Sequence, residues 1–135
     1  MAKLVDSSLW IDLTRTRSPR TLKAFIASQL DDPEICIAEP VTYEVLRHAD
    51  DVEVRLLTQQ FETVPLLSTP AGLWSSGVQL GRACRRKGFN IGSIDLLIAV
   101  VAIYHNAEII TFDDDFEQIA TVSALRVVRL ERPRP

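Results

Sequence analysis

Several acidic residues of this sequence fall at or just beyond the ends of short apolar segments, although they are far apart along the chain. Carboxylates gathered in one cleft repel one another and therefore need a cation. Oxygen ligands without histidine or cysteine partners suit hard cations, chiefly Mg²⁺ or Mn²⁺, which support the hydrolysis of phosphate esters. The candidates for catalytic and metal-binding roles are Asp6, Glu44, Asp95, Asp113 and Asp115.

Each of these acids also has a purely structural explanation. Asp6 would cap a helix that starts at Ser7, and the helix macrodipole would favour Asp95 near a helix N-terminus. Glu44 would be a solvated helix residue, and Asp113–Asp115 would form a polar turn. The joint pattern is more informative, because one acid after a strand is ordinary and four such places in one chain are not.

The segments that must position these acids alternate between short apolar runs and helical periodicity. Strands are expected at residues 2–5, 35–38, 64–67, 107–111 and 126–130, the third at a sheet edge because it contains Pro65. Helices are expected at residues 7–13, 19–30, 52–61, 70–86 and 116–120, with others starting at Pro40 and Ser93. This order predicts an α/β fold with a parallel sheet flanked by helices on both faces, and ligands collect at the carboxyl ends of such strands.

Composition narrows the class of protein. The chain has 135 residues, 47% hydrophobic and 24% charged, and a formal net charge of −3. These values predict one domain over residues 1–135, and they exclude a disordered chain or a uniformly basic nucleic-acid coat. Cys36 and Cys84 each lie inside an apolar segment, which indicates core residues and no disulfide framework. With no signal-peptide pattern and no apolar run of about 18 residues, we expect a cytoplasmic protein without membrane contact.

Four stretches of the chain contain the candidate acids in a regular order: Leu4–Ile11, Pro40–Leu46, Ile91–Ala99 and Thr111–Phe116. Taken in this order, they resemble the motifs of PIN-domain ribonucleases, most closely the VapC toxins of bacterial toxin–antitoxin pairs. Each motif is weak alone, but all four in this order are fairly specific and cover nearly the whole chain.

The resemblance implies a single PIN-like domain with a parallel five-stranded sheet, and a Mg²⁺- or Mn²⁺-dependent endoribonuclease. It also implies a homodimer and a cognate VapB-type antitoxin that blocks the active site. As a toxin, the protein would cut tRNA, mRNA or rRNA and so inhibit translation and growth. Carried over by position, the acidic quartet is Asp6, Glu44, Asp95 and Asp113, with Asp115 as an extra or alternative fourth acid and Asp114 behind it.

Arginine outnumbers lysine twelve to three, and most basic residues fall into three groups. The group just before the Asp95 motif, with Arg82, Arg85 and Arg86, is the first choice for RNA contact, because arginine suits phosphate groups. A solvated helix face is the structural alternative. Ser8 would orient a ligand or phosphate oxygen, or simply cap a helix. Another of the three groups, Arg126 to Arg134 near the C-terminus, would contact an acidic segment of a protein partner.

Other functional classes fit the sequence less well. A haloacid-dehalogenase-type phosphatase would need a second aspartate where Ser8 stands, and a receiver domain would need a lysine after a late strand. The remaining alternatives are a PIN nuclease that processes RNA without being a toxin, and a module that only binds RNA or protein.

The negative net charge is concentrated in the candidate site. Outside the five candidate acids, 13 acidic residues stand against 15 basic ones. Because a bound metal would neutralise the candidate acids, the affinity for RNA should depend on metal as well as on salt.

Overall fold

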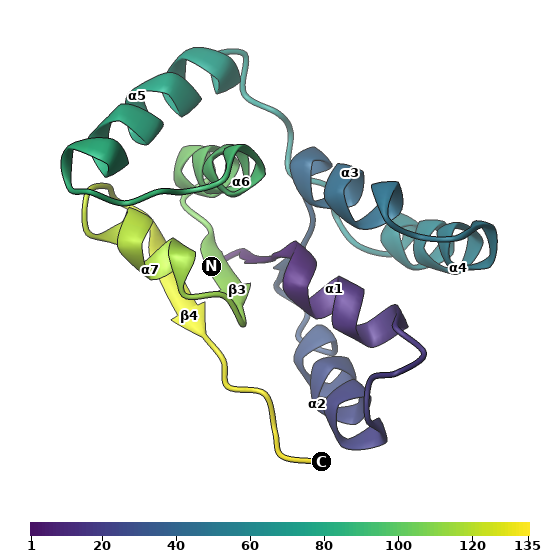
Figure 1. Cartoon of the computed structure of the whole chain (residues 1–135). Coiled ribbons are helices and arrows are strands. Elements are labelled where there is room, and N and C mark those ends of the chain that lie inside the picture. Colours follow the sequence, from purple (N-terminus) through teal and green to yellow (C-terminus); the bar gives the residue numbers. More distant parts are fainter.

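A parallel sheet forms the centre of the computed structural model, which describes residues 1–135 (Figure 1). Its strands pair in the order β2-β1-β3-β4, and every pairing is parallel. Their bounds are β1 Lys3–Val5, β2 Ile35–Cys36, β3 Glu108–Thr111 and β4 Arg126–Arg129.

Seven helices accompany the sheet, so the expected α/β architecture with flanking helices is confirmed. Figure 1 shows α1 and α2 on one side of the sheet, and α6 with α5 outside it on the other. No helix is both long and apolar enough to span a membrane. The helices are α1 Ser7–Thr14, α2 Arg20–Leu30, α3 Glu39–Arg47, α4 Asp51–Glu62, α5 Leu73–Arg86, α6 Ser93–Tyr104 and α7 Asp115–Ala120.

The expectation of five strands is wrong, because residues 64–67 form a single parallel bridge beside β2 and no strand. The Ile37 N–H donates to the Pro65 carbonyl at 2.9 Å, and the Leu67 N–H donates to the Ile37 carbonyl at 2.8 Å. The next bond toward the N-terminus would need an N–H at Pro65, which proline lacks. In the other direction the chain turns into α3 at Glu39, so the ladder stops after one bridge.

The register of the central strands places the candidate acids. Val5 of β1 lies opposite Ile110 of β3, and the Asp6 N–H donates to the Ile110 carbonyl at 3.1 Å. Both strands therefore end at the same edge, with Asp6 following one and Thr111 closing the other. Their apolar residues belong to one cluster of 28 buried hydrophobic side chains, which fixes this alignment.

The loop that delivers α6 to this edge begins at a residue in the left-handed region. Gly88 ends α5 with a φ of 83°, as expected for a helix C-terminal stop, and Asn106 plays the same part after α6 with a φ of 55°. A Cβ at Gly88 would meet no atom within 4 Å, so only its backbone geometry requires glycine.

We predict that Gly88→Ala lowers the free energy of unfolding by about 1 kcal/mol, because alanine is strained at this φ. Gly88→Asn should cost less, because asparagine tolerates the left-handed region that Asn106 already occupies. Urea unfolding of both variants measures the difference. Equal stability of Gly88→Ala and the wild type would contradict the account of this loop.

Candidate metal centre

Asp6 is the most buried acid of the candidate site, with 3% of its surface exposed. As the N-cap of α1, its Oδ1 accepts hydrogen bonds from the Ser8 N–H at 3.1 Å and the Ser8 hydroxyl at 2.6 Å. Its Oδ2 accepts one from the Thr111 hydroxyl at 2.8 Å. Burial raises the pKa of Asp6 to about 6, although these hydrogen bonds favour the charged form. The Asp6 carboxylate thus caps α1 and also bonds to the last residue of β3 at the carboxyl edge of the sheet.

Two hydroxyl groups connect Asp6 to the turn after β3. The Thr111 hydroxyl accepts from the Asp113 N–H at 2.8 Å, and the Ser8 hydroxyl accepts from the Phe112 N–H at 3.1 Å. The Ser8 hydroxyl is therefore committed to Asp6 and to the turn. Together these bonds fix the backbone that carries Asp113 relative to Asp6.

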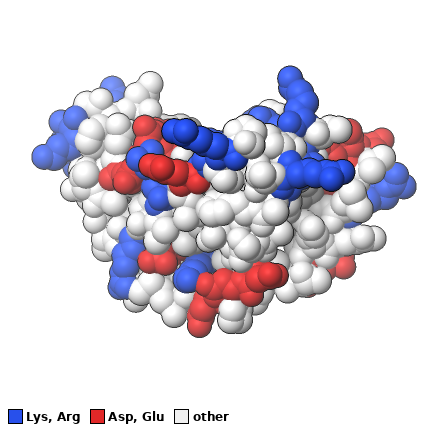
Figure 2. Space-filling view, turned by 90° about the horizontal axis from the view of Figure 1, so that it is seen from below, with Lys and Arg blue, Asp and Glu red and all other residues white.

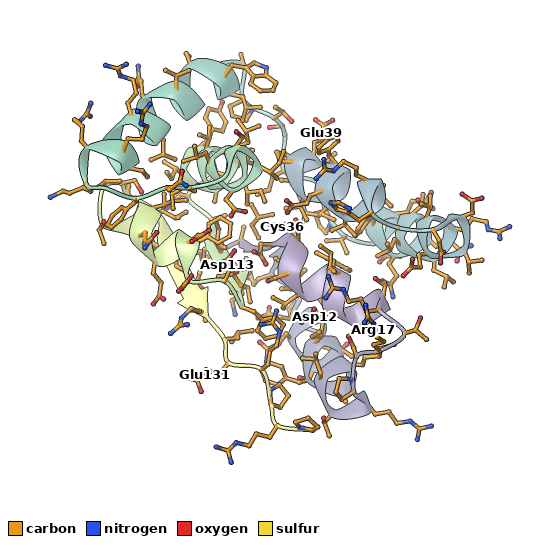
Figure 3. The ribbon with its side chains drawn as sticks, viewed as in Figure 1. Asp12, Arg17, Cys36, Glu39, Asp113 and Glu131 are labelled. Carbon is orange, nitrogen blue, oxygen red and sulfur yellow. The ribbon has the colours of Figure 1, made fainter.

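Three carboxylates meet at this edge. Asp95 in the first turn of α6, Asp113 and Asp115 each offer an oxygen atom, and these atoms lie within 4.8 Å of one another. Figure 3 shows Asp113 where the chain leaves β3, beside the start of α1. The Asp115 N–H also donates to Asp113 Oδ1 at 3.1 Å, whereas Asp114 is exposed and outside the group. Of the three consecutive aspartates, the first and the third thus face Asp95.

The negative charges of the neighbouring acids shift the pKa of Asp95. Burial makes the largest contribution, and with the charges of Asp113, Glu44, Asp6 and Asp115, in that order, it raises the pKa of Asp95 to about 7. Glu44, half-buried on α3, therefore belongs to the same electrostatic neighbourhood.

None of the four ion pairs of the chain involves a carboxylate of this cluster. An oxygen-only set of repelling carboxylates without a basic partner fits a hard divalent cation. The residues that could hold one are Asp95, Asp113 and Asp115, with Asp6 and Glu44 around them.

The arginines predicted to contact RNA form a group of their own on one helix. Arg82, Arg85 and Arg86 are on α5 and line a shallow depression to which no acidic residue contributes. On the face seen in Figure 2, basic and acidic side chains are interspersed and form no single basic surface. The tail arginines are largely used within the chain, since Arg129 pairs with Glu117.

Sequence reasoning gave no role to two features of the site. Thr111 stood in a recognised motif, but its hydroxyl bridge between Asp6 and Asp113 required the strand register. An ion pair joins Asp12 to Arg132 across 120 positions, and no local pattern signals a contact of that separation.

A family model of the PIN domain matches residues 3–122 of this chain. The VapC ribonuclease Mb1587 of Mycobacterium bovis is 32% identical over 127 residues, which cover 91% of this chain and 95% of that relative. Ribonuclease VapC11 of Mycobacterium tuberculosis H37Rv matches with the same identity and coverage.

Solved structures share the fold. A VapBC2 complex from Rickettsia felis, bound to a DNA fragment from its promoter, matches with a TM-score of 0.73 at 18% identity, covering 97% of this chain and 100% of that one. VapBC-1 from nontypeable Haemophilus influenzae matches with a TM-score of 0.72 at 23% identity, covering 96% and 98%.

We predict that the metal-free protein loses stability as the pH rises through about 7. The folded-state pKa of Asp95 lies above its ordinary value of 3.8, so the folded chain binds more protons than the unfolded chain between these values. Thermal unfolding with a chelator at pH 5.5 and pH 8 measures the effect. Asp95→Asn should reduce this dependence, whereas the exposed control Asp114→Asn should keep it. An identical pH dependence in both variants would refute the electrostatic description.

The hydroxyl of Thr111 can be tested by a matched pair of variants. Thr111→Val leaves the Asp113 N–H without its acceptor and Asp6 Oδ2 without its donor, which should cost about 1–3 kcal/mol of unfolding free energy. Thr111→Ser keeps the hydroxyl and should cost only about 0.8 kcal/mol for the lost methyl group. Urea unfolding gives both values, and a serine variant as unstable as the valine variant would contradict the bridge.

Proposed function

Since this chain belongs to the PIN-domain family and to its VapC ribonucleases, we propose that it is the ribonuclease toxin of a type II toxin–antitoxin pair. Its activity is the hydrolysis of RNA phosphodiester bonds, in tRNA, mRNA or rRNA, which inhibits translation and growth. The observation that carries the proposal is the cluster of carboxylates without basic partners at the carboxyl edge of the sheet. The relatives named as ribonucleases match over nearly their whole length.

The proposed cofactor is Mg²⁺ or Mn²⁺, held by Asp6, Glu44, Asp95 and Asp113, with Asp115 as a further ligand. When bound, such a cation neutralises the carboxylates and acts as a Lewis acid toward phosphate oxygens. The close approach of Asp113 and Asp115 to Asp95 supports both members of the turn as ligands.

The side chains of the site then have separate tasks. Ser8 and Thr111 hold both oxygens of Asp6 in place, so that this carboxylate keeps its orientation when RNA arrives. One carboxylate of the cluster takes the proton of the attacking water, and cleavage leaves a 5′-phosphate and a 3′-hydroxyl. We assign the sequence-independent grip on the RNA backbone to Arg82, Arg85 and Arg86, which project from α5 into solvent.

A cognate VapB-type antitoxin and a second copy of this chain are the proposed protein partners. Solved relatives of the same fold include a toxin–antitoxin complex from Klebsiella pneumoniae and VapBC complexes. The surface offers apolar contacts for such partners, since Trp74 is 73% exposed and Val78 is 61% exposed, both on α5. Large apolar side chains gathered on one helix are typical of protein interfaces.

We predict that Asp95→Asn and Asp6→Asn each lower the rate of RNA cleavage with Mg²⁺ or Mn²⁺ by at least about 100-fold, since each removes a carboxylate that we propose as a ligand of the cation. Cleavage of total RNA by protein purified free of wild type measures the loss. Asp114→Asn, in the same turn but exposed, should stay within about twofold of wild type.

Expression of the wild type in bacteria without an antitoxin should arrest growth, and expression of Asp95→Asn should not. A normal cleavage rate for Asp95→Asn would refute the site. An active wild type that leaves growth unchanged would favour an RNA-processing nuclease, and a wild type that binds RNA without cutting it would favour a binding module.

A further inference from the structure

The C-terminal tail continues along the sheet beyond β4 and passes the carboxyl edge. The Leu130 N–H donates to the Thr111 carbonyl at 2.7 Å, so the tail stays beside the end of β3. Figure 1 shows the tail running on from β4 to a terminus near α2. The tail therefore borders the turn that carries Asp113, and this proximity makes its charged residues worth testing.

Arg132 joins the tail to α1 and to the turn at once. Its Nε donates to Asp12 Oδ2 at 2.7 Å, and its guanidinium carbon lies 4.6 Å from the centre of the Phe112 ring. The Asp12 side chain is 10% exposed, and this arginine is its only ionic partner. A carboxylate that is nearly buried needs such a partner, so the contact has a defined energetic reason.

Phe112 is held from two sides. Its backbone N–H donates to the Ser8 hydroxyl, inside the network that binds Asp6, and its ring lies under the Arg132 guanidinium. The ring also stacks against Phe25 of α2, with 6.3 Å between ring centres. Because Phe112 is the residue between Thr111 and Asp113, a shift of its ring would move both the hydroxyl bridge and a carboxylate of the cluster.

We propose that Arg132 is a positioning residue for the metal centre: it clamps the Thr111–Asp113 turn against α1 from outside the carboxylate cluster. The proposal rests on the proposed function for its catalytic consequence, but its structural part concerns only the turn. Arginine suits this place, because its planar group stacks on an aromatic ring while an edge donates to a carboxylate. Lysine would keep the charge opposite Asp12 and lose the planar stack.

The test compares Arg132→Ala with Arg134→Ala, a control in the same tail whose exposed side chain makes neither contact. Amide hydrogen exchange followed by NMR reports directly on the Phe112 and Asp113 N–H groups, which donate to the two hydroxyls. Arg132→Ala should lose protection at these amides and bind Mn²⁺ about tenfold more weakly. Arg134→Ala should match the wild type in both measurements.

In RNA cleavage, Arg132→Ala should lower kcat about tenfold with KM within about twofold, because the turn and not the RNA contact is disturbed. Arg132→Lys should recover part of the loss through the charge. If Arg132→Ala does not fold, Asp12→Asn removes the ion pair while keeping the arginine and should change exchange and Mn²⁺ binding in the same direction.

Exchange rates and Mn²⁺ affinity of Arg132→Ala equal to those of Arg134→Ala would show that Arg132 only anchors the tail, and would overturn the proposal. Neither readout uses RNA. A wild type that binds Mn²⁺ but cuts no RNA would therefore refute the proposed function, while the loss of protection and affinity in Arg132→Ala would still support the clamp.

Discussion

Carboxylates that repel one another share a partly buried space at the carboxyl edge of the sheet, and no basic side chain pairs with them. Burial and like charge raise the free energy of the charged form, which is why the pKa of Asp95 is raised to about 7. A fold that only needed stability would have little reason to gather these acids. A divalent cation bound among these carboxylates would offset their mutual repulsion.

Holding such a cluster requires rigid supports, and the neighbouring strands provide them. The pairing of β1 with β3 brings Asp6 to Thr111, and two hydroxyl groups then fix the turn that carries Asp113. The α6 helix brings Asp95 from the other side, through a loop that begins at Gly88. The net charge of −3 thus reflects a concentrated site, since the rest of the chain holds more basic than acidic residues.

Much of this arrangement follows from sequence patterns. Apolar periodicity predicted the helices and four of the strands, and the rule for parallel sheets predicted that acids after different strands converge. The prediction of a fifth strand was wrong. Residues 64–67 have a strand-like composition, but Pro65 lacks the N–H that would extend the hydrogen-bond ladder. The pairing of Arg132 with Asp12 depends on the path of the tail across the sheet edge, which local patterns do not encode. The sequence ranked Asp113 and Asp115 ahead of Asp114, and in the structure oxygen atoms of Asp113 and Asp115 lie within 4.8 Å of one of Asp95.

Crystals of the protein grown or soaked with Mn²⁺, measured at the manganese absorption edge, test the central claim most directly. The account predicts an anomalous difference peak within coordination distance of carboxylate oxygens from Asp95, Asp113 and Asp115, with Asp6 or Glu44 facing it. Crystals of Asp95→Asn grown in the same way should lose or weaken the peak. A wild-type map with no peak among these carboxylates at millimolar Mn²⁺, or with peaks only elsewhere on the surface, would contradict the account.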